Sequence, residues 1–260
     1  MEPLTLHQGT TPLVVSVPHA GTFLPESVVA DLTPAARTLP DTDWYVDRLV
    51  AFARDVGATV LVATHARMVV DLNRPADDAP LYPGQAGTGL IPETLFDGTP
   101  AWNRLPSEVE KAAWVEAIWQ PYHRALQECL DAAKARHGHA VLWDAHSIRG
   151  RVPRLFEGRL PDLNLGTNGG ASCAPSLRLA AAAVLEAAPF THVVDGRFKG
   201  GHITRHHGRP SEGVHAVQLE MAWHAYLDDR ADPPVWDPVR AGALIGVLQA
   251  FADTLLQWRP

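Results

Sequence analysis

Ala140-Val141-Leu142-Trp143 runs directly into Asp144-Ala145-His146-Ser147, and this junction is the most informative feature of the chain. The apolar run predicts a buried strand, and the polar motif places a histidine where that strand is expected to end. A neutral imidazole can bind a metal ion through one ring nitrogen, while the Asp144 carboxylate and the Ser147 hydroxyl orient the ring. Taken alone, the motif is equally compatible with a buried, hydrogen-bonded histidine, so its surroundings decide between the two roles.

Three further strand-like runs also lead into polar residues. Leu13 to Val17 runs into Pro18-His19-Ala20-Gly21, Val60 to Ala63 leads through Arg67 into Asp71-Leu72-Asn73-Arg74, and Val214 to Leu219 alternates into Glu220. Ligands of open α/β sheets bind outside the carboxyl ends of the strands, so these polar residues are expected to converge on one crevice. The pattern therefore predicts a single active site.

Helical patterns separate the strand-like runs. The clearest helix begins at Ser107, where Ser107-Glu108-Val109-Glu110 is a capping box, and extends toward Gly138, which suits a left-handed C-terminal cap. Pro121 is expected to bend or interrupt it. Further helices are predicted over residues 176–188 and 239–258. The alternation of strands and helices predicts an α/β fold with a mixed, mostly parallel sheet flanked by helices.

The length of 260 residues and the hydrophobic share of 46% favour one large domain with a full core, so residues 1–260 are expected to form a single α/β domain. Two segments rich in Gly and Pro, near residues 75–106 and 196–213, are expected to be functional loop insertions. His202 and His206 have the spacing of paired helical zinc ligands, but the glycines around them argue against a helix and against metal ligation there.

Charge and composition narrow the class of partner. A net charge of -7 argues against nucleic acid or an anionic membrane as the main partner. The expected partner is a small molecule, and an anionic one must be bound by a few placed arginines. No signal-peptide pattern and no apolar run near 18 residues stand out, so a cytoplasmic protein that does not span a membrane is expected. Cys129 and Cys173 lack the spacing of a thiolate zinc site, which leaves His and carboxylate ligands for any metal.

The order of these motifs resembles that of zinc carboxypeptidases and aspartoacylases, and several segments resemble the N-formylglutamate deformylase family more closely. Those segments are residues 17–21, 43–49, 71–75, 87–92 and 200–208. The resemblance spans about Leu13 to Glu220 and implies a zinc-carboxypeptidase-like (phosphorylase/hydrolase-like) fold. It also implies metal-dependent hydrolysis of N-formyl-L-glutamate to formate and L-glutamate, the final step of a histidine-degradation route.

The expected cofactor is Zn²⁺, although His and carboxylate sites also accept other divalent ions. Catalytic zinc generally takes three protein ligands and keeps one position for water. His19 and His146 follow strand-like runs and are the natural nitrogen ligands.

The third metal ligand is expected to be a carboxylate, and Asp43, Asp47 and Glu26 are the candidates. Carboxypeptidases use the position three residues after the first histidine, which here is Thr22. The resemblance favours Asp43, with Asp47 one helical turn further on as a supporting partner. The alternative role of Asp43 is a helix N-cap.

Glu220 is the expected general base, because a carboxylate at the end of a strand can take a proton from the attacking water and return it to the leaving amine. The resemblance supports this role, and the alternative is a surface glutamate on an edge strand. By the same resemblance Arg67 stabilises the tetrahedral oxyanion, with a salt bridge to a surface acid as its alternative.

Arginines are expected to recognise the substrate. Arg74 offers a planar donor fork and Asn73 an amide, which together match an α-carboxylate. A second carboxylate needs a second cation, for which Arg205 and Lys199 lie in the Gly-rich loop that could close over the ligand.

Other functions remain open at this point. The same residues would serve a hydrolase of another N-acyl amino acid, and a non-catalytic metal- or amino-acid-binding protein is the alternative from a different class. A serine hydrolase is disfavoured because the chain has no Gly-x-Ser-x-Gly elbow. Ser147 is instead explained as a neighbour of His146. The sequence does not indicate an oligomeric state.

Overall fold

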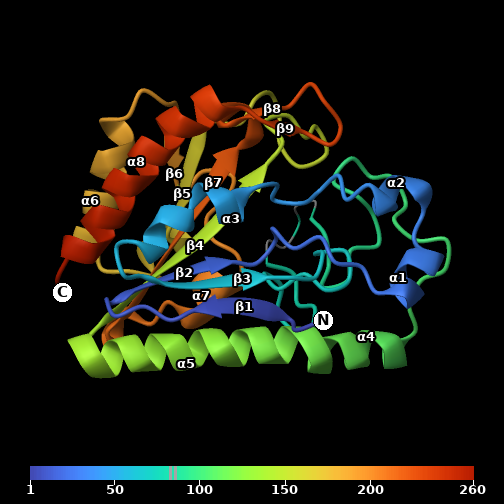
Figure 1. Ribbon diagram of the computed structural model, residues 1–260, viewed down its shortest axis with the longest axis horizontal. Helices are drawn as coiled ribbons and strands as arrows, with labels where there is room; N and C mark the ends of the chain where they lie inside the picture. Colours follow the sequence, from blue (N-terminus) through green and yellow to red (C-terminus); the bar gives the residue numbers. More distant parts are fainter. Residues whose placement is uncertain (82–83, 85–86) are drawn as a thin grey trace.

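A seven-stranded sheet in the order β1-β3-β2-β4-β7-β5-β6 forms the centre of the computed structural model, which describes residues 1–81, 84 and 87–260 (Figure 1). Its pairs are parallel except β1 with β3 and β5 with β7. The strands are β1 (Leu4–His7), β2 (Leu13–Val17), β3 (Thr59–Ala63), β4 (Ala140–Ile148), β5 (Leu163–Gly166), β6 (His192–Val194) and β7 (Val214–Ala222). A separate pair joins β8 (Leu227–Asp228) to β9 (Val235–Trp236). The expectation of a mixed, mostly parallel sheet is confirmed.

Helices cover both faces of this sheet. In Figure 1 the long helix α5 lies beneath it, while α6 and α8 lie together against the opposite face. The α-helices are α1 (Glu26–Asp31), α2 (Pro34–Arg37), α3 (Val46–Leu49), α4 (Glu108–Trp114), α5 (Gln120–His137), α6 (Pro175–Glu186), α7 (His202–His207) and α8 (Pro238–Gln257). Short 3-10 turns occupy Ala51–Arg54, Asn168–Gly170, Pro210–Glu212 and Trp223–Ala225. Each face of the sheet thus has its own hydrophobic core.

The two central strands, β4 and β7, carry the predicted polar motifs inside the sheet rather than beyond its edge. Each is nine residues long, buried throughout, and they pair in parallel with His146 opposite Glu220. The strands continue past their apolar runs because the polar side chains are buried too and the backbone pairing goes on. Glu220 is therefore on a central strand, and the alternative of a surface glutamate on an edge strand is wrong.

The long helix follows the sequence signals closely. Ser107 and Glu110 form the reciprocal capping box, and Gly138 adopts a left-handed conformation with φ 80° at the C-terminal end. Before Pro121 the helix widens into a π-helical turn, Val115–Trp119, and then continues as α5. Because proline has no N–H to donate, such a wide turn accommodates it without ending the helix.

The segment 196–213 differs from its prediction, because it contains α7. The first turn of α7 is held by Asn73, whose backbone oxygen accepts from His202 N at 3.2 Å and whose Oδ1 accepts from Ile203 N at 2.8 Å. A distant side chain thus caps a helix that the local glycines disfavour. The described part of the segment 75–106 contains no helix or strand, as expected; residues 82–83 and 85–86 lie outside the described residues.

Helix α8 departs from one expectation, because it is long and apolar enough to cross a membrane by length and composition alone. Its buried residues pack against α6 and the sheet, as in the core helix of a globular domain. They are Ala241, Leu244, Leu248, Phe251, Ala252 and Leu255.

Packing of α8 on the sheet generates a stability prediction. Phe251 is fully buried and meets the Trp143 ring edge-on, with ring centroids 5.3 Å apart. Phe251→Ala should lower the free energy of unfolding by about 3–5 kcal/mol, the usual cost of such a cavity. Val239→Ala, at a position 81% exposed on the same helix, is the control and should change it by less than about 0.5 kcal/mol. Denaturant titration measures both, and equal effects would show that α8 does not depend on this contact.

Candidate active site

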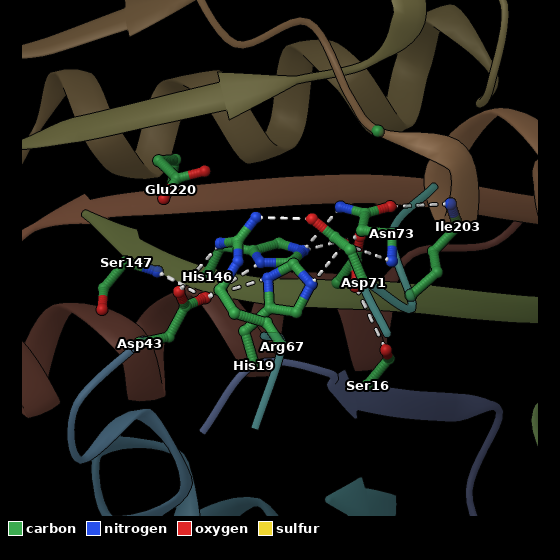
Figure 2. A network of polar contacts seen from close by, with 12 residues as sticks. Ser16, His19, Asp43, Arg67, Asp71, Asn73, His146, Ser147, Ile203 and Glu220 are labelled. Atoms are coloured by element: carbon green, nitrogen blue, oxygen red, sulfur yellow. Dashed lines mark hydrogen bonds and ion pairs between the residues drawn. The ribbon is translucent and has the colours of Figure 1, made fainter. Parts of the chain in front are cut away.

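Most of the predicted functional side chains line one cavity of about 80 Å³. Figure 2 shows those that it labels converging from β4, β7 and the loops that follow β2 and β3. The predicted residues that line this cavity are His19, Asp43, Arg67, Asn73, Arg74, His146, Ser147 and Glu220. The expectation of a single crevice therefore agrees with the structure of the described residues.

His19, Asp43 and His146 form a compact, buried group of potential metal ligands. Their ligand atoms lie within 4.8 Å of one another, with Nδ1 of His146 3.0 Å and Nδ1 of His19 3.7 Å from Oδ2 of Asp43. Among the described residues, the buried atoms Nδ1 of His19 and Oδ1 of Asp43 have no hydrogen-bond partner. Buried polar atoms are normally satisfied, and two nitrogens with one carboxylate are ligands that Zn²⁺ prefers. The residues therefore fit a divalent metal ion.

Buried carboxylates lie beside both histidine rings. Nε2 of His19 lies 2.8 Å from Oδ1 of Asp71, and Nε2 of His146 lies 3.0 Å from Oδ2 of Asp144. Nδ2 of Asn73 also lies 2.9 Å from Nε2 of His146. In metal sites a carboxylate at one ring nitrogen commonly directs the other nitrogen to the ion. Asp144 thus lies beside His146, and its supporting role stays a prediction.

The loop that carries Asp43 is tied to the strands beside it. The backbone N–H of Asp43 donates to the carbonyl of His19 at 3.0 Å, and its Oδ2 accepts from the backbone N–H of Ser147 at 3.1 Å. Oγ of Ser147 in turn lies 2.7 Å from Oη of Tyr226. The residue that precedes α3 is Tyr45, with no side-chain cap, so the alternative of Asp43 as a helix N-cap is wrong.

The other carboxylate candidates lie elsewhere. Asp47 is exposed on α3 and Glu26 is exposed in the first turn of α1, and neither belongs to the described residues that line the cavity. The supporting role of Asp47 stays a prediction without a contact in the site. Asp43 is the carboxylate that faces both histidines.

The positive charge of Arg67 lies close to two of the buried carboxylates. Its Nη2 donates to Oδ2 of Asp71 at 2.6 Å, its Nη1 lies 3.8 Å from Oδ1 of Asp43, and the guanidinium lies 4.8 Å from the centroid of Phe96. Burial alone would raise the pKa of Asp71, but the Arg67 and His19 charges hold it well below its usual value. The alternative of a salt bridge to a surface acid is wrong, because both acids are buried.

Glu220 is a buried carboxyl group whose pKa is raised to the neutral range. It is 7% exposed, and burial, assisted by the charges of Asp43 and Asp144, raises its pKa to about 8 against the lowering effect of His146 and Arg67. A carboxyl group of this pKa in a cavity can both take up and return a proton. Nε2 of Gln218, two residues earlier on β7, lies 3.5 Å from its Oε2.

Of the basic residues predicted to recognise substrate, one lines the cavity and two do not. Arg74 lines the cavity, and its Nε donates to the carbonyl of Thr88 at 2.7 Å. Nε of Arg205 donates instead to the carbonyl of Gly200 at 2.9 Å, and Lys199 is exposed. Neither Arg205 nor Lys199 is among the described residues that line the cavity, so their roles stay predictions.

Arg197 and Gln218 are among the residues of the cavity wall that sequence reasoning did not assign to the site. Arg197 lines it, with Nε donating to the carbonyl of Leu155 at 2.7 Å, and so does Gln218. The alternation of β7 could have identified Gln218, because residues two apart share a strand face with Glu220. No local signal shows which basic residue of the segment 196–213 faces the cavity.

The approach of α7 to the site requires a glycine. A Cβ added at Gly201 would lie 2.3 Å from Nδ2 of Asn73 and would displace the amide that contacts His146. The backbone N–H of Gly201 also donates to Oε1 of Gln218 at 2.8 Å. The glycine-rich segment thus brings the end of α7 close to Asn73.

Comparisons with known proteins found similar sequences and structures over most of the chain. A family model described as N-formylglutamate amidohydrolase matches residues 11–227. The N-formylglutamate deformylase of Pseudomonas aeruginosa is 51% identical over 260 residues, covering 99% of this chain and 97% of that protein. The enzyme of the same name from Pseudomonas putida is 49% identical, with coverages of 98% and 96%.

Two solved structures share the fold. The crystal structure of N-formylglutamate amidohydrolase from Ralstonia eutropha has a TM-score of 0.84 at 27% identity and covers 99% of this chain and 97% of that chain. A gene product from Agrobacterium tumefaciens has a TM-score of 0.74 at 18% identity, with coverages of 98% and 95%, and is similar in fold.

The ligand geometry predicts how metal content responds to mutation. His146→Ala and His19→Ala should each lose bound metal, because the remaining pair cannot supply three ligands. His192→Ala, which changes an exposed histidine on β6, is the matched control and should keep the metal content of the wild type. Elemental analysis of the purified variants measures this, and full metal occupancy in His146→Ala would remove His146 from the ligand set.

Proposed function

Because the chain belongs to the N-formylglutamate amidohydrolase family, we propose that it hydrolyses N-formyl-L-glutamate to formate and L-glutamate with the aid of a divalent metal ion. The observation that carries the proposal is the position of Glu220 beside a buried set of three potential metal ligands, in a cavity that arginines also line. A proton acceptor, a metal site and carboxylate-binding groups are the parts that this hydrolysis needs.

The proposed ion is Zn²⁺, held by His19, Asp43 and His146. The orphaned nitrogen of His19 and oxygen of Asp43 support this assignment, and other divalent ions suit the same ligands. When bound, such an ion would supply Lewis-acid activation of water and of the formyl carbonyl group.

Glu220 is the proposed general base. Its carboxylate would take a proton from the water whose oxygen forms the new bond to the formyl carbon. It would then deliver that proton to the amine nitrogen as the carbon–nitrogen bond breaks, which releases formate and L-glutamate. The pKa of about 8 suits both transfers, since neither protonation state is strongly disfavoured near neutral pH.

Arg67 is proposed to stabilise the negative charge that develops on the formyl oxygen. Its guanidinium is buried, lines the cavity and is fixed by Asp71, so little reorganisation is needed when charge appears. Burial alone would lower the pKa of Arg67, but the Asp71 and Asp43 carboxylates raise it. The guanidinium therefore stays cationic.

Asn73 and Arg74 are proposed to bind the α-carboxylate of the substrate. Arg197, which lines the same cavity, is the proposed partner of the side-chain carboxylate in the described conformation. Arg205 and Lys199 keep their proposed role if the loop that carries them closes over bound substrate. The small cavity favours the formyl group, which needs almost no acyl pocket.

The proposed pathway context is the last step of a histidine-degradation route, and the proposed location is the cytoplasm. Cys129 and Cys173 are buried and not in a disulfide, which agrees with a reducing compartment.

The proposal is tested by measuring formate release from N-formyl-L-glutamate with protein of known metal content, before and after chelation. N-acetyl-L-glutamate and N-formyl-L-alanine serve as comparison substrates for the acyl group and for the side-chain carboxylate. Chelator-sensitive release that is fastest for N-formyl-L-glutamate is expected. Preferential turnover of the acetyl compound would identify a hydrolase of another N-acyl amino acid, and no turnover of any compound by metal-loaded protein would reject the proposed activity.

The role of Glu220 gives a sharper prediction. Glu220→Gln should retain the metal and lose about two to four orders of magnitude in kcat, the typical contribution of general acid–base catalysis. Glu212→Gln, which removes an exposed carboxylate ahead of β7, should have the kcat of the wild type. Steady-state kinetics together with metal analysis decide the matter, and near-normal turnover of Glu220→Gln would exclude it as the base.

Substrate variation tests the two basic groups of the segment 196–213. Arg197→Ala should reduce kcat/KM for N-formyl-L-glutamate by about tenfold to a hundredfold, in line with loss of a charge-assisted hydrogen bond, and should affect N-formyl-L-alanine much less. Arg205→Ala is made alongside as the comparison. A selective loss in Arg205→Ala alone would show that the closed loop presents Arg205 to the side-chain carboxylate and would exclude Arg197.

A further inference from the structure

Three consecutive backbone carbonyls beside the cavity, those of Leu72, Asn73 and Arg74, accept hydrogen bonds from two helices. The carbonyl of Leu72 lies 2.8 Å from Nε2 of His123, and that of Arg74 accepts from Nε1 of Trp119 at 2.9 Å. The carbonyl of Asn73, between them, accepts from the first turn of α7. Each peptide plane of the segment that carries Asn73 and Arg74 is thus fixed by a separate donor.

The two side-chain donors form one unit on the long helix. The rings of Trp119 and His123 stack with centroids 3.9 Å apart and an interplanar angle of 28°. Trp119 is the last residue of the π-helical turn, and His123 follows one turn later in α5. π-Helical turns occur frequently at functional sites, where they change which side chains a helix presents to its neighbours.

The protonation state of His123 is set by its surroundings. A carbonyl oxygen can only accept, so Nε2 must carry the proton that is donated to Leu72. Nδ1 of His123 lies 3.3 Å from Nε2 of His207, and the two rings are stacked 5.6 Å apart. Burial lowers the pKa of His123 to about 3, and the neighbouring His202 and His206 oppose protonation further, so the ring stays neutral.

Because the carbonyls of residues 72–74 are held in place, the directions in which the Asn73 and Arg74 side chains leave the backbone are restricted. Asn73 is held at both ends of its amide, by Ile203 N at Oδ1 and beside Nε2 of His146 at Nδ2. The Arg74 guanidinium returns to the carbonyl of Asn73 through Nη1 at 3.0 Å. Bidentate recognition of a carboxylate requires donors placed to within about 0.5 Å, so a rotation of these peptide planes would weaken it.

We propose that Trp119 and His123 are positioning residues that hold Asn73 and Arg74 in the geometry that binds the substrate α-carboxylate. The inference rests on the proposed function, because it adopts the role given there to Asn73 and Arg74. Neither Trp119 nor His123 is among the described residues that line the cavity, so both act through the backbone of the segment 72–74. Trp119 and His123 thus influence substrate affinity without contacting the substrate.

The test separates substrate binding from turnover. Trp119→Phe removes the indole N–H and keeps an aromatic ring, and His123→Leu removes the imidazole N–H. Each should raise KM for N-formyl-L-glutamate by about fivefold to tenfold, the effect of losing one hydrogen bond, with kcat within about twofold of wild type. Metal content should be unchanged. His123→Gln places an amide N–H near the position of Nε2, so its KM should be close to that of the wild type.

A matched control is available in Trp258. Its Nε1 donates to Oγ of Ser176 at 3.0 Å, and it follows α8 and belongs to the core to which α6 and α8 contribute. It is not among the described residues that line the cavity. Trp258→Phe therefore removes a comparable indole hydrogen bond and should leave KM unchanged. An equal rise in KM for both tryptophan variants would overturn the proposal, because it would indicate a general loss of stability. Unchanged KM in Trp119→Phe and His123→Leu, or loss of metal with unchanged KM, would also overturn it.

Failure of the proposed function would look different. In that case wild-type protein would not release formate, and calorimetry would test binding of L-glutamate, which carries the same α-carboxylate. Weaker binding to Trp119→Phe than to the wild type, with wild-type affinity in Trp258→Phe, would support the positioning role independently of turnover. Equal affinities in all three proteins, or no binding by the wild type, would overturn it.

Discussion

The carboxylate of Asp71 is the contact on which the site depends, because three different functional groups are fixed to its two oxygens. Oδ1 lies 2.8 Å from Nε2 of His19 and accepts from the backbone N–H of Asn73, and Oδ2 accepts from Arg67. Asp71 is completely buried, and a buried charge is tolerated only when its lone pairs are satisfied and a counter-charge lies close by. One side chain thus contacts a potential metal ligand, the arginine proposed to stabilise the oxyanion, and the backbone of a residue proposed to bind substrate.

The same balance explains how so many ionisable groups share a small buried volume. Contacts with the two histidines lower the pKa of Asp43 despite its burial, whereas the pKa of Glu220 rises because burial and neighbouring carboxylates outweigh His146 and Arg67. Two acids that line one cavity therefore differ in pKa. Asp43 stays ionised, which suits a proposed metal ligand, and Glu220 is more readily protonated, which suits a proposed proton carrier. This division of roles follows from which carboxylate has a positive partner at hydrogen-bond distance.

The sequence predicts the layered α/β fold and most of the candidate site, because apolar periodicity marks the strands and the polar residues at their ends stand out. It fails where tertiary contacts override local signals: α7 forms because Asn73 caps it, although the glycines before His202 disfavour a helix. It also fails for Arg197, whose direction depends on a bond to the Leu155 carbonyl far along the chain. Motifs reveal which residue types are present, and only packing reveals which of several similar cations faces the cavity.

The parallel register that sets His146 opposite Glu220 joins two segments 74 positions apart in the chain, and it has a consequence for the order in which the protein is made. All three potential metal ligands precede residue 149, whereas Glu220 lies on the strand that enters the sheet between β4 and β5. During synthesis, the N-terminal part emerges from the ribosome first. The nascent chain therefore contains all three potential metal ligands well before it contains the proposed general base, and the proposed hydrolysis must wait for β7.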